Sequence, residues 1–540
     1  MPDPQTAAAT AVDRAADVVA IATEHLARAA TVDGRISVAK LDEHQVLGYD
    51  LAHAASAVEG AKVMLDYGVR GEVESLLARA FIADAVADLG AKLLGREGVW
   101  GVDAGVLADA WPFVEEHRSP EFLESLAATL ERSGTGPSHL PDDFQLAADT
   151  FHRFAEDKIR PVAEHIHRTN ADIPEDLIQG LAELGGFGLS VPEEYGGFAS
   201  GGESDYLGMV VATEELSWGS LGVGGSLITR PEILTRAIVA GGTDEQKQRW
   251  LPSIAAGELM VGVTVTEPDY GSDVAGVSTM ATPVDGGYRI NGVKTWATFA
   301  GRANLLMLLA RTDPDKSISH RGLSLFVVEK DAVPGHAFAL EQEEGGKLDG
   351  RAIDTIGYRG MHSYEVSFSD WFVPAANLVG GDGGLGKGFY LQMEGFENGR
   401  LQTAARAVGL MQAAFDAGLA YAQQRVVFAK PVFDYELSRM KLARMAALIQ
   451  AGRQFSYDVA RRMGRGEGTL AASMVKAYVC RSAEWVTREA MQLHGGMGYA
   501  EEFPVSRYFV DARVLSIFEG ADETLCLRVI ARRLAEQALQ

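Results

Sequence analysis

Residues 287–300, GYRINGVKTWATFA, have a β-type pattern that the chain before residue 259 lacks. Valine, isoleucine, threonine and aromatic residues favour pleated strands, and Asn291-Gly292 is a turn signal. Short segments of the same kind recur up to residue 375, separated by turn signals such as Asp285-Gly286-Gly287. The sequence therefore predicts a β domain over residues 259–375, a small sandwich or barrel. Its other strand segments are MVGVTVTEP (260–268), ANLLMLLART (303–312), GLSLFVVEK (322–330) and SYEVSFSDWFVP (363–374).

The segments on both sides of this β domain have helical patterns. Residues 142–258 form the helical segment before it, and 389–540 the segment after it. Residues 1–133 are also helical in pattern, and the breakers Ser133-Gly134-Thr135-Gly136-Pro137 mark a linker behind them. The predicted fold class is mainly α with a central β domain and an extra N-terminal helical domain. The longest helices are expected at about 389–424, 435–464 and 469–493.

Composition narrows the class of protein. The 540 residues include 49 Lys+Arg against 74 Asp+Glu, a net charge of −25, which argues against nucleic acid and anionic membranes as partners. Only Cys480 and Cys526 are present, so no disulfide framework and no cysteine-type metal site is expected. The N-terminus has no signal-peptide pattern, and no run of about 18 apolar residues exists. We expect a soluble, cytoplasmic protein without membrane insertion.

Two distant segments resemble one another. Residues 50–101 and 442–498 both show an LA-x-x-A-A pattern, then a basic residue and tyrosine, then a helix that ends in glycine. Shared amphipathic composition explains this equally simply. The alternative is a degenerate duplication of a helix pair, which would pack on the body as a partner subunit's helices do.

Several familiar motifs are incomplete. Residues 381–386, GDGGLG, form a G-x-G-x-x-G without the βαβ context of a dinucleotide fold, so a connector is the simpler interpretation. His494 has no partner at metal-ligand spacing, and we predict no metal site. No G-x-S-x-G motif is present, which leaves Ser-His-Asp chemistry without support.

Two strand ends carry groups that suit a flat cofactor. In residues 264–273 a strand runs into a turn with hydroxyls and acids, which can bind carbonyl or phosphate oxygens or be an ordinary capped turn. In the next strand Trp296 and Thr298 are two residues apart, and side chains at that spacing share a strand face. That geometry suits stacking on a flat cofactor, although a tryptophan is by default a core residue.

Near the C-terminus a single carboxylate, Glu519, stands in the apolar stretch 516–521, SIFEGA. A carboxylate in an apolar pocket is held closer to neutrality, which suits a general base near pH 7. A glutamate in such a run is more often a satisfied residue at a helix end, so this stretch alone does not decide its role.

Together these segments resemble the acyl-CoA dehydrogenase family over residues 142–540. The resemblance rests on separate motifs in the family's order, and on helical, β and helical domains that follow in its order. The motifs are VTVTEPDYGSD (263–273), NGVKTWATFAG (291–301), QRVVFAKPV (424–432), MQLHGGMGY (491–499) and SIFEGADETLCLRVIARRL (516–534).

The resemblance implies a site with bound FAD and an acyl-CoA substrate. Glu519 matches the family's catalytic base, which removes the α-proton while a β-hydride passes to flavin N5. The substrate-contact positions would be Ser272, Arg400, Phe518 and Gly520. The residues implied in FAD binding are Val265, Thr266, Trp296 and Thr298, with Arg425, Phe428, Gln492, Gly495 and Gly496 reaching the ADP part of FAD in a neighbouring subunit.

Some positions depart from the family's pattern. Relatives that take the base from an earlier helix would place it at Gly399, which cannot act, and Glu397 lies two residues away on another face of the helix. Phe518 replaces the commoner tyrosine, and Ala521 the usual threonine. Phe299 stands where an asparagine often follows the flavin threonine.

The extra N-terminal helices sharpen the resemblance to a subfamily, the methylsuccinyl-CoA dehydrogenases. This implies oxidation of a short branched acyl group, (2S)-methylsuccinyl-CoA to mesaconyl-CoA in the ethylmalonyl-CoA pathway, with an electron-transferring flavoprotein as the acceptor. A carboxylate-bearing substrate needs a cation, for which Arg230 is the candidate, although it could be a plain surface arginine. We expect a homodimer rather than a tetramer, because residues 1–133 would cover a surface that other members bury between dimers.

Other classes of function stay open at this point. One is a dehydrogenase for another short branched acyl-CoA, and another is a flavin oxidase that reduces O₂ directly. A third is a non-catalytic acyl-CoA binding protein, against which Glu519, Thr266 and Arg425 argue.

Overall fold

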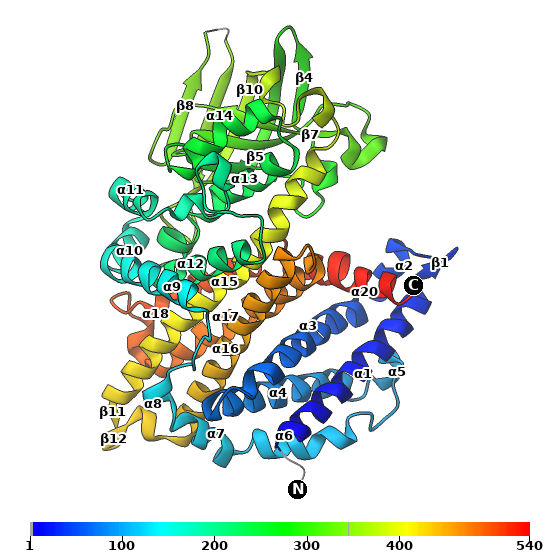
Figure 1. Ribbon diagram of the computed structural model, residues 1–540, viewed down its shortest axis with the longest axis vertical. Helices are drawn as coiled ribbons and strands as arrows, with labels where there is room; N and C mark the ends of the chain where they lie inside the picture. The colour runs from blue at the N-terminus through cyan, green and yellow to red at the C-terminus, as the bar shows by residue number, and fades with distance from the viewer. Residues whose placement is uncertain (1–3, 344) are drawn as a thin grey trace. The chain divides into compact units, whose positions relative to one another are not determined.

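The computed structural model describes residues 4–343 and 345–540, and its elements are labelled in Figure 1. The chain forms two compact units: unit 1 comprises Met1–Gln145 with Thr403–Gln540, and unit 2 comprises Leu146–Gln402. Helices α9 (Asp142–Phe154) and α15 (Gly388–Gln424) carry the chain from one unit into the other. In the described ranges no helix is long and apolar enough to cross a membrane.

Unit 2 is built on one eight-stranded sheet, with strand order β3-β6-β4-β5-β10-β9-β8 and β7 paired with β6. The longest pairing joins β5 and β10 antiparallel, whereas β3 and β6 run parallel. The bounds are β3 Val261–Thr264, β4 Met280–Val284, β5 Gly287–Thr298, β6 Leu305–Arg311, β7 Leu323–Glu329, β8 Ala337–Glu341, β9 Lys347–Ile353 and β10 Ser363–Pro374. The central β element of the predicted fold class is therefore confirmed, as one sheet.

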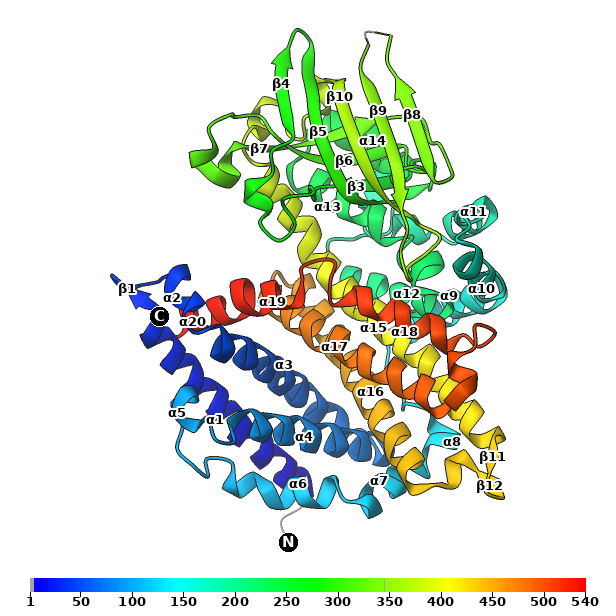
Figure 2. The same cartoon turned by 180° about the vertical axis from the view of Figure 1, so that it is seen from behind.

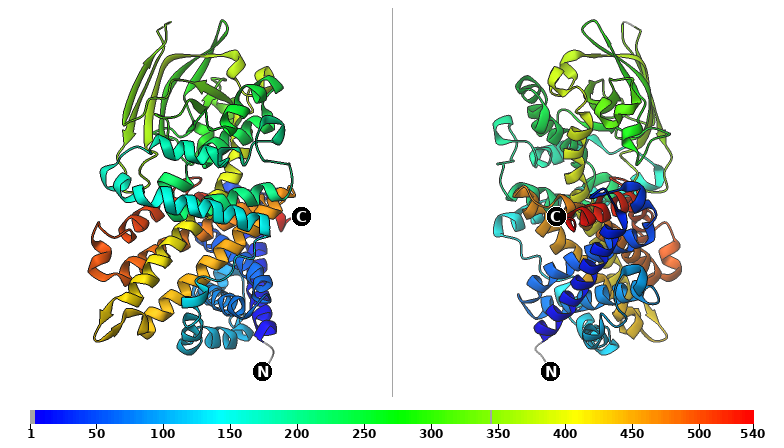
Figure 3. Two further views of the ribbon diagram at one scale, coloured as in Figure 1. Left: turned by 60° about the vertical axis from the view of Figure 1, so that its left-hand side comes forward. Right: turned by 90° about the vertical axis from the view of Figure 1, so that its right-hand side faces the viewer.

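Both faces of β6 are buried, which explains its unbroken apolar sequence. Leu305, Met307 and Leu309 lie in one core cluster, together with residues of the helices on that side. The alternate residues Leu306 and Leu308 lie in a second cluster on the other face. In the left-hand view of Figure 3 the strands are seen nearly edge-on, with green helices on one side.

The helices of unit 2 cover that face of the sheet. Helix α14 (Asp244–Ala255) begins with a complete capping box between Thr243 and Gln246, and α13 (Thr229–Gly241) contacts β3. Besides short 3-10 turns, the unit also contains η2 Ala155–Ile159, α10 Arg160–Thr169, α11 Glu175–Glu183, α12 Ser204–Gly219 and η5 Leu221–Gly225, with η2 and η5 in π-helical form.

Unit 1 is a bundle of long helices, and the predicted bounds of its longest members are correct to within a residue. The N-terminal helices α3 and α4 pack on α16 and on one another, and α3 also contacts α17. Figure 2 shows these blue helices beside the orange α16 and α17. The main bounds are α1 Pro4–Ala30, α3 Gln45–Gly68, α4 Glu72–Leu93, α6 Trp111–His117, α7 Pro120–Ala127, α16 Glu436–Gly464, α17 Thr469–Leu493, α18 Val505–Leu515, α19 Asp522–Thr524, η12 Leu525–Ala531 and α20 Arg532–Gln537.

Each of the two similar sequence segments forms a helix pair. Residues 50–101 contain most of α3 and all of α4, and 442–498 contain most of α16 and all of α17. The duplication itself stays a hypothesis. The division into four domains also stays a prediction, because compactness groups the N-terminal helices with the C-terminal bundle.

The predicted linker is held firmly in place. Thr135 is 5% exposed and donates its hydroxyl to Gln412 at 2.7 Å, while Arg453 donates to the same hydroxyl at 3.1 Å. Tyr67 of α3 and Gln450 of α16 both donate to the carbonyl of Pro137. The linker is therefore tied to the helices of unit 1 at Thr135 and Pro137.

Candidate active site

The turn that follows β3 contains two of the predicted cofactor residues, Val265 and Thr266. Lys294 of β5 donates its ammonium to the Val265 carbonyl at 2.9 Å, and the Thr295 amide donates to the Thr266 carbonyl at 2.8 Å. Val265 is 4% exposed, while Thr266 is half-buried. The backbone of this turn is therefore fixed by the neighbouring strand.

A buried ion pair completes this arrangement. Glu267 and Lys294 are 2.8 Å apart and are 4% and 0% exposed. Glu267 also accepts hydrogen bonds from the Ser278 amide and hydroxyl and from the Thr279 amide. Burial raises the pKa of Glu267, but the Lys294 charge and these hydrogen bonds outweigh it and lower the pKa to about 2. Burial lowers the pKa of Lys294, and the Glu267 charge only partly offsets this effect.

The end of β5 departs from the regular strand that the sequence predicts. Trp296 has φ 57° and lies at a register shift in the pairing of β5 with β10, so the strand bulges there. Trp296 is 55% exposed, whereas Thr298 is 7% exposed. Trp296 and Thr298 were predicted to share a strand face because side chains alternate along a strand. The bulge interrupts this alternation.

Thr298 and Phe299 are tied to the start of β10. The hydroxyls of Thr298 and Ser363 are 3.1 Å apart, and the Phe299 amide donates to the His362 carbonyl at 2.8 Å. Phe299 has φ 67° and is 3% exposed. Its ring fills the position where the family's asparagine was expected.

The predicted substrate residues of unit 2 lie in different environments. Ser272 is exposed in the loop after β3, whereas Arg400 on α15 is 7% exposed. Arg230 near the start of α13 is 5% exposed, so it is not a surface arginine. Its guanidinium donates to the Tyr358 hydroxyl at 3.4 Å, and Tyr358 has φ 58°. Gly399 is buried, and Glu397 is partly exposed.

In unit 1 Glu519 lies in the loop between α18 and α19, with Phe518 and Gly520 beside it. Glu519 has φ 53°, a left-handed conformation that is uncommon for a residue with a side chain. Its carboxylate atom Oε2 is inaccessible to solvent. Strained conformations of this kind cost about 1–3 kcal/mol and persist only where the surroundings impose them.

Three contacts from neighbouring helices impose the path of this loop. Lys476 of α17, 1% exposed, donates to the Gly520 carbonyl at 2.6 Å. The fully buried Arg406 of α15 lies 4.6 Å from the centre of the Phe518 ring. Ser516 donates its hydroxyl to Glu484 at 2.5 Å. The sequence pattern did not single out Lys476, Arg406 and Glu484, nor the Glu267–Lys294 pair. The signal that could have pointed to them is a charged residue within an otherwise apolar segment.

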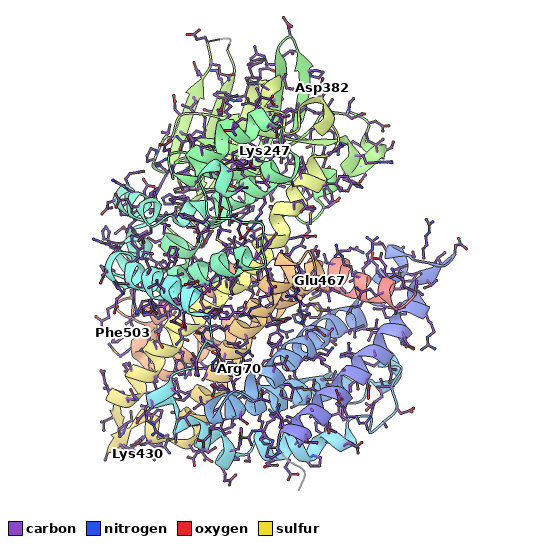
Figure 4. The ribbon with its side chains drawn as sticks, viewed as in Figure 1. Arg70, Lys247, Asp382, Lys430, Glu467 and Phe503 are labelled. Atoms are coloured by element: carbon purple, nitrogen blue, oxygen red, sulfur yellow. The ribbon has the colours of Figure 1, made fainter. Side chains whose placement is uncertain are left out.

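The residues predicted to reach the ADP part of a neighbour's FAD gather at one end of unit 1. Tyr421 stacks on His494 with ring centroids 4.2 Å apart, which joins the end of α15 to the end of α17. Phe503 packs edge-on against Tyr421 and is labelled in Figure 4. Lys430, in the short hairpin of residues 426–431 that follows α15, is also labelled there. Arg425, Gln492, Gly495 and Gly496 are exposed, and Phe428 is 91% exposed with φ 48°.

Comparisons with known proteins decide the family. Sequence models of the acyl-CoA dehydrogenase N-terminal, middle and C-terminal domains match residues 141–258, 262–371 and 386–535. The chain is 37% identical over 525 residues to (2S)-methylsuccinyl-CoA dehydrogenase of Cereibacter sphaeroides, which covers 94% of this chain and 93% of that protein. The chain belongs to the acyl-CoA dehydrogenase family.

Solved structures agree with this assignment. Butyryl-CoA dehydrogenase of Megasphaera elsdenii superimposes with a TM-score of 0.65 at 32% identity, covering 73% of this dehydrogenase and 98% of that chain. A glutaryl-CoA dehydrogenase of Mycobacterium smegmatis in complex with FADH2 gives a TM-score of 0.64 at 25% identity. The match covers 73% of this chain and 95% of that chain. Acyl-CoA dehydrogenases are FAD-dependent, and FAD is the cofactor of this enzyme.

The residues present fit that cofactor. Trp296 offers an exposed aromatic plane at the end of β5, beside a turn whose backbone is fixed. At Gly495 and Gly496 no atom lies within 4 Å of where a Cβ would stand, so a ligand can approach the backbone. The exposed Arg425 supplies a cation of the kind that pairs with phosphates.

Proposed function

We propose that this acyl-CoA dehydrogenase oxidises a short branched acyl-CoA with a distal carboxylate, namely (2S)-methylsuccinyl-CoA to mesaconyl-CoA, a reaction of the ethylmalonyl-CoA pathway. The observation that carries the proposal is the extent of the similarity to the Cereibacter sphaeroides enzyme, which covers 94% of the chain. The similarity to the isovaleryl-CoA dehydrogenase of Solanum tuberosum covers only 78% of this chain. A similarity over 94% of the chain reaches into the N-terminal helices.

In the proposed mechanism Glu519 is the general base. It accepts the proton from the α-carbon of the thioester while the C–H bond at the β-carbon breaks and a double bond forms. Bound FAD supplies the acceptor for the β-hydride. The backbone N–H of Glu519 donates to the thioester carbonyl and stabilises the charge that develops on its oxygen. Phe518, Gly520 and Arg400 shape the acyl site, and Ser272 contacts the CoA part or a flavin phosphate.

The cofactor contacts are assigned to two groups of residues. Val265, Thr266, Trp296 and Thr298 contact the isoalloxazine ring, and the Glu267–Lys294 pair supports this assignment because it fixes the turn that presents the first two. Arg425, Phe428, Gln492, Gly495 and Gly496 bind the ADP part of FAD in a neighbouring subunit. Their exposure at one end of unit 1 supports the second assignment, since residues that serve a neighbour must be accessible.

Arg230 is the proposed partner of the distal carboxylate. A guanidinium binds a carboxylate through parallel hydrogen bonds, and the interaction strengthens when water is excluded. Burial of Arg230, which keeps its guanidinium away from bulk water, supports the assignment. An electron-transferring flavoprotein is the proposed acceptor of the electrons, and the enzyme is proposed to be a cytoplasmic homodimer.

Anaerobic reduction of the bound flavin by a panel of short acyl-CoA esters tests this function. Methylsuccinyl-CoA is expected to bleach the flavin faster than butyryl-CoA, isovaleryl-CoA and 2-methylbutanoyl-CoA. Faster bleaching by an ester without a carboxylate would contradict the substrate assignment. Steady-state peroxide production at the rate of turnover would indicate an oxidase instead.

A further inference from the structure

The loop that carries Glu519 is also held by the N-terminal helices. Tyr49 of α3 donates its hydroxyl to a carboxylate oxygen of Asp522 at 2.6 Å, and His53 Nε2 lies 3.0 Å from the same oxygen. Asp522 is 9% exposed and His53 is 4% exposed, so the contact is largely dry. Two residues of the N-terminal extension therefore bind a carboxylate three residues beyond the proposed base.

Asp522 controls the geometry of that loop. Its amide donates to the Ser516 carbonyl at 3.0 Å, which closes the segment that contains Glu519, and Asp522 is also the first residue of α19. A displaced Asp522 side chain would release the end of this closed loop. The left-handed φ of Glu519 makes the loop conformation sensitive to the loss of such contacts, because a non-glycine residue relaxes from that conformation once its surroundings loosen.

The contact belongs to a continuous packed surface. Helix α3 contacts η12 and α17, and a Cβ placed at Gly48 would lie 3.4 Å from Leu527 and 3.6 Å from Ala531. Tyr49 is thus presented to Asp522 by a helix that packs closely on the segment after α19. Burial raises the pKa of Asp522, but the His53 and Tyr49 hydrogen bonds and the charges of His53 and Lys476 outweigh this and keep it lowered, so the carboxylate stays ionised near neutral pH.

We propose that Tyr49 and His53 are positioning residues for the catalytic base, acting through Asp522. The N-terminal extension then supplies part of the active-site support, a role that goes beyond covering an apolar surface. The proposal rests on the proposed role of Glu519. The α3 brace, meaning Tyr49, His53 and Asp522, holds the base in its productive orientation, and small misplacements of a catalytic group reduce the rate steeply.

The test compares variants that lose similar hydrogen bonds at two places. The double variant Tyr49→Phe/His53→Leu removes both bonds to Asp522, and the control Tyr67→Phe/His139→Leu removes two bonds between the N-terminal helices and the linker, Tyr67 to Pro137 and His139 to Glu74. We expect kcat with methylsuccinyl-CoA to fall about tenfold in the brace variant, with KM within about twofold and FAD content unchanged. The control is expected to keep kcat within about twofold.

Hydrogen exchange of the backbone amides gives a readout that does not depend on the reaction. In the brace variant residues 516–522 are expected to exchange faster while α16 keeps its protection, whereas the control leaves 516–522 unchanged. Unchanged kcat in the brace variant, or equal loosening of 516–522 in the control, would overturn the proposal. If the double variant does not fold, Tyr49→Phe alone carries the comparison with Tyr67→Phe. If Glu519 is not the base, the variant Glu519→Gln will react at the wild-type rate. In that case the hydrogen-exchange result still decides whether the brace holds the loop.

Discussion

The turn after β3, which we propose faces the flavin, and the base loop, residues 516–522 with the proposed base Glu519, are held in different ways. The turn after β3 is fixed by its own Glu267 and by Lys294 of β5, which are 27 residues apart. The base loop is fixed from several helices, and its Asp522 bonds reach Tyr49, 473 residues away. One region therefore carries its support within a local piece of sheet, while the other depends on segments from both ends of the chain.

This difference has a physical origin. Ladders of backbone hydrogen bonds already hold the strands of a sheet, so the buried ion pair and a few hydrogen bonds have to fix only the turn after β3. A loop between helices has no such ladder, and side chains from the packed helices must supply its hydrogen bonds. The four predictions that follow break or sharpen this contrast, beginning with the largest effect.

Lys294→Met breaks the local support of the turn. It leaves the Glu267 carboxylate buried without its ion-pair partner, so we expect a loss of about 3–5 kcal/mol in the free energy of unfolding together with lower FAD content. Urea unfolding and flavin absorbance measure both quantities. The matched control is Lys347→Met, which breaks the exposed pair with Glu341 in the same sheet and should leave the free energy of unfolding nearly unchanged, because water screens an exposed ion pair. Equal losses in the two variants would contradict the structural role of the buried pair.

Glu519→Gln removes the proposed base while it keeps the shape of the loop. Loss of general-base catalysis should lower the rate of flavin reduction at least about a hundredfold, with FAD and ligand binding retained. Stopped-flow flavin bleaching with methylsuccinyl-CoA measures this rate. Glu523→Gln, an exposed carboxylate on α19, serves as the control and should react at the wild-type rate. Bleaching of the Glu519 variant at the wild-type rate would refute the assignment.

Arg230→Ala removes the proposed partner of the substrate's distal carboxylate. Loss of a charge-assisted hydrogen bond should lower kcat/KM for methylsuccinyl-CoA about tenfold or more. The rate with 2-methylbutanoyl-CoA should change much less, because that acyl group has no carboxylate. Steady-state kinetics with both esters provide the measurement, and equal losses would show that Arg230 has a structural role only.

The pH dependence of stability gives the smallest effect. Because the pKa of Glu267 is lowered to about 2 in the folded protein, its contribution is present above the ordinary value near 4.5 and is lost as pH falls towards 2. This single group adds a slope of at most about 1.4 kcal/mol per pH unit. Urea midpoints at pH 5, 4 and 3 should therefore fall more steeply for the wild type than for Glu267→Gln, and parallel curves would count against the ionised buried pair.

The sequence predicts much of the fold because its periodicities are strong. Alternating β-branched segments and long helical runs identify the β domain and give the bounds of α15, α16 and α17 to within a residue. The bulge at Trp296 was missed, since alternation says nothing about an extra residue until the pairing with β10 is known. The hydrogen bonds that hold the predicted linker could not be foreseen, because the partners of Thr135 and Pro137 lie on helices far along the chain.

The candidate site shows a similar limit. Motifs predict roles for Glu519, Trp296 and Arg425, because local sequence patterns express the chemistry of those residues. The residues that hold them do not stand out: Lys294 is one lysine in a strand, and Tyr49 is one tyrosine in a helix. Their roles follow only from partners in distant segments, and a single sequence does not record which distant residues meet.

The packing of α3 and α4 on α16 also affects how the protein is made. Asp84 of α4 bonds to Arg444 of α16 at 2.7 Å, and the two residues are 360 positions apart. At typical translation rates of about 5–20 residues per second, the N-terminal helices wait about 20–70 s for their partners to leave the ribosome. During that interval their apolar faces are open to solvent and to chaperones. The support of the base loop is thus among the last parts of the molecule to assemble, although its first half is synthesised earliest.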